Sequence, residues 1–422
     1  MAARRSAARP RLLAMDGLRL LCALAVAGYH YGVAWRIDGV HPPAYHLPTA
    51  SHVLIYGFLG VELFFMISGF VICMSSWGRG LGEFFTSRVV RVYPAFWISC
   101  LITAVVIAVL PVTVGVPVAT KLTPPDIAVN MTMLAEPLST PLVDTVYWTL
   151  WVELRFYLLF ALLSWRGLTY RRVTAFCILW MTAAILTPSL DSKLIDTLVM
   201  PTWAPYFVAG VAMYLMHRYR PNALLWAIVG FCWLVSLQRV QVRIADVHPG
   251  FSVPGWPALL IITVAYGVML AIALGRTSRI TWRWLGTAGC LTYPFYLLHQ
   301  RIGYSVIRAV HDRAALPASV LIIGTMAAVL ALAWLVHRFV ERPLAPVLRS
   351  ALRRALAEIR TSPVGDGAAG TGTVAGADRP TVPSPRPHAL AGRQEGGSPS
   401  ADQTGDRSEG VAYQASGAAS PQ

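Results

Sequence analysis

The apolar residues of this chain gather in long windows that are separated by short polar segments. A membrane-spanning helix needs about 20 mainly apolar residues, and ten windows of this kind can be placed between residues 12 and 339. The pattern therefore predicts an all-α membrane protein, a bundle of about ten transmembrane helices. The windows are 12–34, 52–76, 94–112, 146–165, 172–188, 196–216, 223–238, 256–275, 284–307 and 317–339.

The basic residues predict how these helices are oriented. If the first residue is cytoplasmic, the arginines of the segments predicted inside greatly outnumber those of the segments predicted outside. Such an excess is typical of cytoplasmic loops. We therefore expect a multi-pass protein of the plasma membrane, in contact with the lipid bilayer and with both termini in the cytoplasm. The net charge of +15 follows this loop pattern, so it does not indicate a nucleic-acid partner.

Composition divides the chain into four regions. A basic cytoplasmic N-terminus covers 1–11, the transmembrane domain 12–345 and a basic cytoplasmic helix 346–360. Residues 361–422 are rich in Gly, Ala, Ser and Pro, which predicts a disordered low-complexity tail. The six cysteines have no paired spacing and no histidine companions, so neither disulfides nor a metal site is expected. The loop at 113–145 either covers an acceptor site or is a surface loop without function.

Charged and titratable residues inside the first span suggest chemistry. An ionised side chain at the bilayer centre costs about 2.5 to 3.5 kcal/mol, so its presence there is a functional hypothesis. Arg19 and His30 are eleven residues apart, which places them on one helix face about 16 Å apart along the axis. The alternative for His30 is an ordinary core histidine that is hydrogen-bonded to a neighbour.

Glu153 lies in the fourth span, which runs in the opposite direction. It enters by roughly two turns from the outside, so His30 and Glu153 are expected at similar depths. A histidine beside a carboxylate acts as a general base whose tautomer the carboxylate fixes. The alternative is that Glu153 forms a structural ion pair with Arg155 or Arg19.

The second span and the segment after it add further polar residues. Glu62 and Ser68 belong to a span with small residues that permit close helix packing. Arg88 and Arg91 follow on the cytoplasmic side, on a short helix expected directly before a span that starts at Pro94. Their spacing places both guanidinium groups on one side, where they are suited to a phosphate. Ordinary cytoplasmic arginines are the alternative.

The ninth span contains two tyrosines, a proline and a second histidine. The proline, Pro294, is expected to kink this helix. Tyr293, Tyr296 and His299 would then face a polar centre. The alternative is that they are ordinary residues of the membrane interface.

Taken in order, these motifs resemble the acyltransferase 3 family of membrane acyltransferases, which includes the O-acetyltransferases of lipopolysaccharide and peptidoglycan and the O-acyltransferases of macrolides. The resemblance extends over the transmembrane domain, 12–345. It rests on Asp16-Gly-Leu-Arg19 with His30, Phe64-Phe65-x-x-Ser68-Gly69-Phe70, Arg88-x-x-Arg91, Trp148-Thr-Leu-x-x-Glu153, Thr292-Tyr293-x-x-Tyr296-Leu-x-His299 and Glu341-Arg342-Pro343.

This resemblance implies a donor, an acceptor and roles for the residues. Acyl-CoA, most simply acetyl-CoA, would be the co-substrate, with no permanently bound cofactor. The acceptor would be a hydroxyl of a carbohydrate or of a glycosylated or polyketide metabolite. The resemblance implies that Arg19 and His30 are essential, that Arg88 and Arg91 face the CoA phosphates, and that Glu153, Tyr293 and His299 shape the reaction centre.

Three alternatives stay open at this point. An acyl group carried on His30 competes with direct transfer to the acceptor. The chain could instead be a permease or flippase for a glycan or lipid-linked solute, with the buried charges lining its path. The acceptor could be modified on either side of the membrane, and a separate extracytoplasmic partner enzyme could complete the transfer.

Overall fold

The computed structural model describes residues 12–118, 121–249, 252–314 and 316–361. Within these ranges the chain is helical and has no strand, which confirms the predicted all-α class. The predicted basic N-terminus, 1–11, and the predicted disordered tail, except for residue 361, lie outside the described residues.

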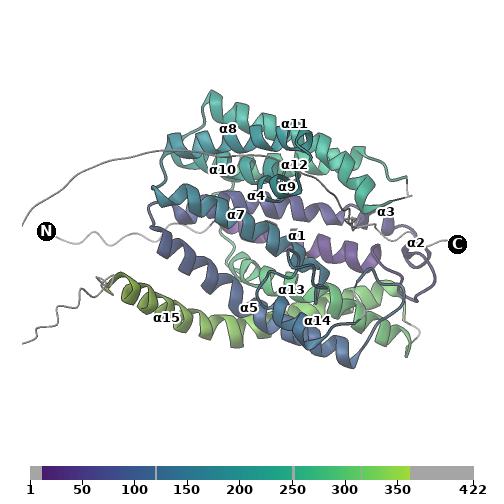
Figure 1. Ribbon diagram of the computed structural model, residues 1–422. Coiled ribbons are helices and arrows are strands. Elements are labelled where there is room, and N and C mark those ends of the chain that lie inside the picture. Colours follow the sequence, from purple (N-terminus) through teal and green to yellow (C-terminus); the bar gives the residue numbers. More distant parts are fainter. Residues whose placement is uncertain (1–11, 119–120, 250–251, 315, 362–422) are drawn as a thin grey trace, which may run out of the picture. The chain divides into compact units, whose positions relative to one another are not determined.

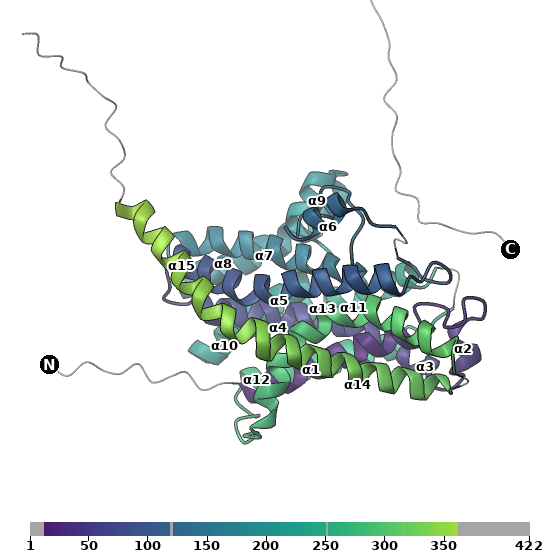
Figure 2. The same ribbon diagram turned by 90° about the horizontal axis from the view of Figure 1, so that it is seen from below.

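Long helices run roughly parallel to one another and make up most of the fold (Figure 1). The short helices α2 and α3 lie at one end of this bundle, here called the α2 end, and α15 extends from the other end, the α15 end (Figure 2). The long helices are α1 (Leu13–Gly32), α4 (Gly60–Ser76), α5 (Leu81–Val109), α7 (Trp148–Trp165), α8 (Tyr170–Leu186), α10 (Ala204–Tyr219), α11 (Ala223–Val247), α12 (Trp256–Ala273), α13 (Trp284–His311), α14 (Ala318–Val336) and α15 (Arg342–Thr361).

Shorter helical segments connect these long helices. Several of them continue directly into a long helix, as η1 does into α4 and η2 does into α7. They are α2 (Pro43–His46), α3 (Ser51–Leu54), η1 (Gly57–Leu59), α6 (Pro124–Asn130), η2 (Thr145–Tyr147), η3 (Thr187–Ser189), α9 (Lys193–Val199) and the π-helical η4 (His337–Glu341).

Eight helical stretches of the described chain are long and apolar enough to cross a membrane. Two further helices, α1 and α13, correspond to the first and ninth predicted spans and carry more polar residues. They pack against each other along their length and lie in the middle of the bundle (Figure 1). Polar side chains on α1 and α13 are therefore shielded from lipid by the apolar helices around them. The chain is a multi-pass membrane protein.

Two glycines bring the backbones of α4 and α10 into direct contact. A Cβ atom at Gly69 would lie 2.1 Å from the carbonyl oxygen of Phe207, and one at Gly210 would lie 2.0 Å from that of Met66. No larger residue fits at either position unless the helices separate. Small residues have this role where membrane helices pack closely, as the small residues of the second span predicted.

Three predicted boundaries are corrected by the structure. The segment that bears Arg88 and Arg91 is not a separate short helix, because α5 runs without a break through Pro94. Membrane helices tolerate proline where neighbouring groups satisfy the freed backbone. The window at 196–216 is divided into α9 and α10 by Met200, which has a left-handed backbone. The seventh span continues to Val247, beyond the predicted 238.

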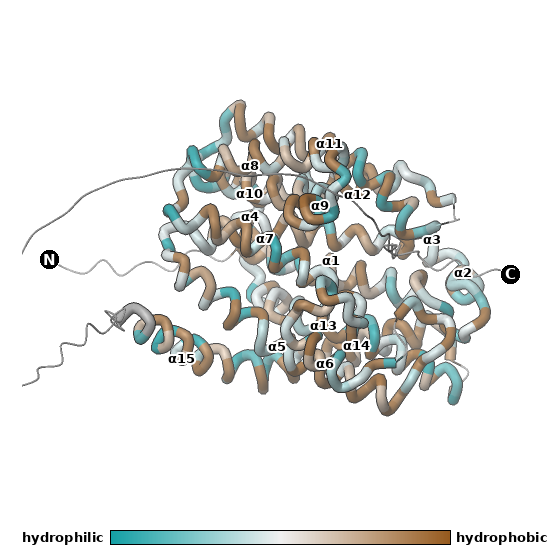
Figure 3. Tube along the Cα trace, in the orientation of Figure 1, coloured by the Kyte–Doolittle hydropathy of each residue, from teal (hydrophilic) through white to brown (hydrophobic). Residues whose placement is uncertain are grey.

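The C-terminal part of the bundle ends in an amphipathic helix. A π-helical turn joins α14 to α15, and His337 Nδ1 lies 2.7 Å from Glu341 Oε2 across that turn. Hydrophilic and hydrophobic residues alternate along α15 (Figure 3), which packs on α5. The predicted basic helix, 346–360, is therefore the greater part of a longer helix that starts at Arg342.

Candidate active site

Two imidazoles from opposite ends of the sequence form a hydrogen-bonded pair. His30 lies in the last turn of α1 and His299 lies on α13, and His30 Nδ1 is 2.8 Å from His299 Nε2. The rings stack with their centroids 5.0 Å apart. His299 is buried, whereas His30 is partly exposed. Of the two residues, His30 is therefore the one with solvent exposure.

The hydrogen bonds of the pair fix where its protons are. His299 Nδ1 is 2.7 Å from the carbonyl oxygen of Tyr296, and a carbonyl oxygen only accepts. His299 Nδ1 therefore carries a proton, and Nε2 of the neutral ring accepts a hydrogen bond from His30 Nδ1. The remaining nitrogen, His30 Nε2, has a free lone pair and is the basic atom of the pair. A proton taken up at His30 Nε2 makes this ring an imidazolium. The hydrogen bond from His30 Nδ1 to His299 Nε2 would stabilise that charged ring.

Side chains from two other segments hold the turn of α13 that carries His299. Tyr31 donates its hydroxyl proton to the carbonyl oxygen of His299 at 2.6 Å. The backbone N–H of Arg301 donates to Asp144 Oδ2 at 3.0 Å. These bonds fix the position of the imidazole relative to α1.

Asp144 is a buried residue that the sequence interpretation missed. It precedes η2 and also accepts a hydrogen bond from the backbone N–H of Val146 at 3.3 Å. Burial raises the pKa of Asp144 to about 7, although the hydrogen bonds from Arg301 and Val146 act in the opposite direction. An acidic residue directly before a span was the available signal, since aspartate is a favoured helix N-cap.

A cavity between α1, α4, α5, α7 and α13 collects six of the candidate site residues. Its free volume is about 80 Å³, below the roughly 300 to 1,000 Å³ of most small-molecule sites. Phenylalanine and valine side chains form much of its wall. The candidate residues that line it are Arg19, Ser68, Arg91, Glu153, Tyr293 and Tyr296.

Glu153 belongs to this cavity and does not pair with His30. Ser68 Oγ donates a short hydrogen bond to Glu153 Oε1. Arg19 and Arg91 line the same cavity, so the carboxylate faces two guanidinium groups. The expected arrangement, in which Glu153 orients His30, is therefore corrected: His299 takes that position. The sequence gives the depth of a residue in the membrane only to within one or two helical turns. It therefore could not decide whether Glu153 or another residue at a similar depth lies beside His30.

Arg155, the other alternative partner of Glu153, turns away from it. Its guanidinium donates to the carbonyl oxygen of Thr197 at 2.7 Å and lies over the ring of Trp151, 5.3 Å from the centroid. Of the two structural pairings considered for Glu153, only proximity to Arg19 agrees with the structure.

A second cavity adjoins the first toward the α15 end. Its free volume is about 440 Å³, and it shares Arg19, Arg91, Gly289 and Tyr293 with the first cavity. Arg79 adds a third arginine, and Asp16 and Glu341 add two carboxylates. An anionic group could therefore approach the first cavity along guanidinium groups.

Arg88 and Arg91 face different spaces although they are three residues apart on α5. Arg91 is exposed and lines both of the cavities described above. Arg88 donates from Nη2 to Ser75 Oγ at 3.2 Å and borders an adjoining, mainly apolar pocket that shares Glu153 and Tyr157 with the first cavity. The two guanidinium groups therefore border different pockets on either side of Glu153, and no phosphate site between them is defined by this arrangement.

The two tyrosines of α13 connect the cavity to the rest of the bundle. Tyr293 donates its hydroxyl proton to the carbonyl oxygen of Val92 on α5 at 3.1 Å. Tyr296 Oη is 3.1 Å from Thr149 Oγ1, and its backbone carbonyl holds His299. Tyr296 therefore links the cavity, which its side chain lines, with the histidine pair one turn further along α13.

Glu62 has a partner that the sequence interpretation did not identify. Arg243 Nε on α11 donates to Glu62 Oε1 at 2.7 Å, and Glu62 is fully buried. The Arg243 guanidinium also lies 4.5 Å from the centroid of the Trp203 ring. The predicted seventh span ended at 238, so Arg243 fell beyond it, whereas α11 continues to Val247.

The site combines a base with a cationic approach. His30 Nε2 is suited to take a proton from a hydroxyl. The cavities beyond Tyr296 offer arginines to an anionic ligand and apolar walls to an uncharged chain. A membrane enzyme that transfers a group to a hydroxyl is the class of protein that this fold and site indicate.

Comparison with known proteins agrees with that class. The family model described as "Acyltransferase domain", acyltransferase 3, matches residues 12–338, and the chain belongs to this family of membrane acyltransferases. Acyltransferase MdmB of Streptomyces mycarofaciens is 26% identical over 374 residues, which cover 79% of this chain and 91% of that protein. No solved structure matches the chain.

Proposed function

We propose that this acyltransferase moves an acyl group, most simply acetyl, from acyl-CoA to a hydroxyl of a carbohydrate or of a glycosylated or polyketide metabolite. The observation that carries the proposal is the tautomer of the histidine pair, which leaves Nε2 of the partly exposed His30 as the basic nitrogen. The arginine-containing cavities support a polyanionic donor such as CoA. Membership in an enzyme family disfavours the permease alternative.

In the proposed reaction His30 acts first as a base and then as an acid. His30 Nε2 takes the proton of the acceptor hydroxyl while the oxygen attacks the thioester carbonyl. The bond between the carbonyl carbon and sulfur then breaks, and the thiolate of CoA leaves and takes the proton back from His30. His299 positions the ring, and its Nε2 accepts a hydrogen bond from the imidazolium. The acceptor loses its O–H bond and gains an ester bond, and the thioester loses its C–S bond. The proton passes through His30 Nε2 to the sulfur of CoA.

The donor is proposed to enter from the α15 end. Arg79 and Arg91 would contact the phosphates of CoA, and the acyl thioester would reach past Arg19 toward Tyr296. The distribution of arginines supports assigning the α15 end to the cytoplasm, where acyl-CoA is made, and the protein to the plasma membrane. An acceptor would then meet His30 from the α2 end.

Replacing His30 by glutamine tests the proposed base. Mass spectrometry of envelope glycans and secreted metabolites from a deletion strain would first identify the acceptor, as the molecule that lacks one acyl group. With that acceptor and purified protein, His30→Gln is expected to lower kcat by about 10²- to 10⁴-fold, because no group then takes the hydroxyl proton. Binding of acyl-CoA, measured by calorimetry, should be unchanged.

The matched control is His52→Gln, because His52 is an exposed histidine outside the site. This variant should keep wild-type kcat. Undiminished acyl transfer by His30→Gln would overturn the assignment of the base. Incubation with labelled acyl-CoA and no acceptor should leave the protein unlabelled, and label on His30 would contradict direct transfer in favour of an acyl-enzyme.

A further inference from the structure

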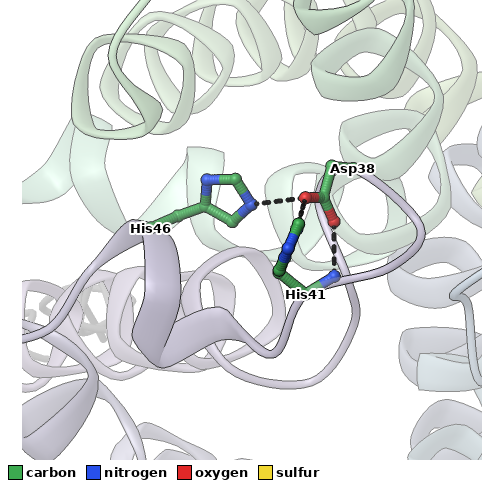
Figure 4. A group of neighbouring side chains, drawn as sticks. All are labelled: Asp38, His41 and His46. Carbon is green, nitrogen blue, oxygen red and sulfur yellow. Dashed lines mark hydrogen bonds and ion pairs between the residues drawn. The ribbon is translucent and has the colours of Figure 1, made fainter.

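A cluster of one aspartate and two histidines lies in the loop between α1 and α3, apart from the active site. In Figure 4 the carboxylate of Asp38 lies between the rings of His41 and His46. Asp38 Oδ2 is 2.5 Å from His41 Nδ1 and 3.2 Å from His46 Nε2. One ligand atom from each residue lies within 4.8 Å of the other two. Three metal-ligating groups therefore converge on one point.

The backbone of the loop holds Asp38 in place. Its other carboxylate oxygen, Oδ1, accepts the backbone N–H groups of Val40 and His41 at 2.9 and 2.8 Å. Arg308 on α13 donates to the carbonyl oxygens of Ile37 and Arg36 at 2.6 and 2.7 Å. These bonds engage Oδ1 and the main chain, so Oδ2 stays directed at the two imidazoles.

His46 has a nitrogen that the protein alone does not satisfy. Its Nε2 is buried and, although it is near Asp38 Oδ2, the two atoms lack the alignment of a hydrogen bond. The side chains of Asp38 and His46 are only 17% and 15% exposed, and that of His41 is 48% exposed. Burying an unpaired imidazole nitrogen is unfavourable. A ligand shared with Asp38 would remove that cost.

We propose that Asp38, His41 and His46 form a binding site for a zinc ion. Imidazole nitrogen and carboxylate oxygen are common zinc ligands, and three protein ligands leave one position for water or a fourth residue. His311 at the end of α13 is the nearest candidate for that position, since its ring centroid is 6.0 Å from that of His46.

The observed spacing is close to that of a zinc site. Ligands about 2.0 to 2.1 Å from a tetrahedral zinc ion lie roughly 3.3 Å from one another. The pair of Asp38 and His46 already has this separation. The contact of His41 Nδ1 with Asp38 Oδ2, 2.5 Å long, would have to lengthen. His41 is the most exposed of the three side chains, and its ring stacks on the exposed ring of Tyr45, with centroids 4.3 Å apart, so it is the ligand that would adjust.

A zinc ion here would join the loop that follows α1 to α2. Arg308 fastens that same loop to α13. The metal would thus stiffen the α2 end beside the helices that carry His30 and His299. Zinc binding itself does not depend on the reaction proposed above, because none of its ligands lines the active-site cavities.

Equilibrium dialysis with zinc tests the proposal. Purified full-length protein without a polyhistidine tag is stripped with a chelator, dialysed against zinc chloride and analysed for metal by mass spectrometry. About one zinc per chain is expected for the wild type and for His52→Ala, since His52 lies outside the cluster. His46→Ala and His41→Ala should each weaken binding by more than about 100-fold, because even outer partners of a metal site contribute 10- to 100-fold.

A thermal melt separates lost zinc binding from lost folding. Zinc is expected to raise the Tm of the wild type and of His52→Ala but not that of His46→Ala. In the absence of zinc the three proteins should melt within a few degrees of one another. If His46→Ala fails to fold, the more exposed His41→Ala provides the same comparison. Equal zinc stoichiometry and affinity in the wild type and His41→Ala would overturn the proposal.

Discussion

At the level of single residues, the histidine pair divides two tasks. In the proposed reaction His30 presents its free nitrogen to the reactant, and His299 holds the ring of His30 while its own Nδ1 is bound to the carbonyl oxygen of Tyr296. Positioning by a buried acceptor replaces the carboxylate that the sequence suggested for this role. A neutral acceptor avoids placing a second charge beside the base inside the membrane.

His299→Leu tests whether His299 is a positioning residue. This change removes the acceptor for His30 Nδ1, so kcat should fall by about 10-fold or more, up to the roughly 10²- to 10⁴-fold that a general base contributes, while KM for acyl-CoA stays within about twofold. His299→Gln retains an acceptor oxygen and should recover part of the loss. Steady-state kinetics on the three proteins measures the split between kcat and KM.

A purely structural role for His299 predicts a different result. Both variants would then lose folded protein, and the active fraction that remains would have wild-type kcat. Titration of active sites by stoichiometric acyl-CoA binding distinguishes the two cases.

At the level of helices, close packing of α4 on α10 positions part of the active-site wall. Ser68 and Phe65 on α4 line the first cavity, next to the contact that Gly69 and Gly210 allow. The shape of the cavity therefore depends on how closely the backbones of α4 and α10 approach each other, although this contact does not involve the reacting groups.

Gly210→Val is expected to force the two helices apart. The added side chain would overlap the carbonyl oxygen of Met66, and overpacking of this kind costs about 1 to 3 kcal/mol or more. Lower Tm and a smaller monodisperse fraction in size-exclusion chromatography are expected. Gly324→Val on α14 is the matched control, since no atom lies within 4 Å of a Cβ there. Equal loss in both variants would contradict the packing argument.

At the level of the whole molecule, the polar groups follow one line along the bundle. Three sets of polar groups lie on or beside α1 and α13. They are the arginines near the α15 end, Glu153 with Ser68 in the middle, and the histidine pair toward the α2 end. The apolar helices around them separate this line from lipid. Folding must therefore bury several titratable groups, and stability should respond to pH.

Asp144 provides a measurable part of that response. Its pKa in the folded protein is about 7, well above the usual value of about 3.9, so the folded state holds the proton more tightly than the unfolded chain. The free energy of unfolding should therefore fall as pH rises from about 4 to 7, by up to roughly 1.4 kcal/mol per pH unit. Above pH 7 this contribution should be level.

Melting temperatures at pH 5.5 and 8 test this expectation. The wild type should lose more stability between the two values than Asp144→Asn, which cannot titrate. Asp126→Asn is the control. Asp126 is partly exposed, and hydrogen bonds from Thr123 lower its pKa, so it does not titrate between pH 5.5 and 8 and adds no pH dependence there. Identical pH dependence in the wild type and Asp144→Asn would show that Asp144 is not protonated in the fold.

The amino-acid sequence was sufficient to predict the class of fold, most helix positions and the family. Apolar windows identify membrane helices because lipid demands continuous internal hydrogen bonding of the backbone. Buried charge identifies candidate chemistry because it is costly. For this reason Arg19, His30, Glu153 and His299 stand out in the sequence alone.

Which of these residues meet depends on how the helices pack in three dimensions. Hydropathy gives the depth of a residue to within a turn or two but carries no rotation about the helix axis, and rotation selects neighbours. His30 therefore pairs with His299, Glu153 with Ser68, and Glu62 with Arg243. Asp144, Asp38 and His41 lie in loops and His46 ends the four-residue helix α2. No helical period reveals a shared site there, so the partners of these residues depend on how the chain folds back.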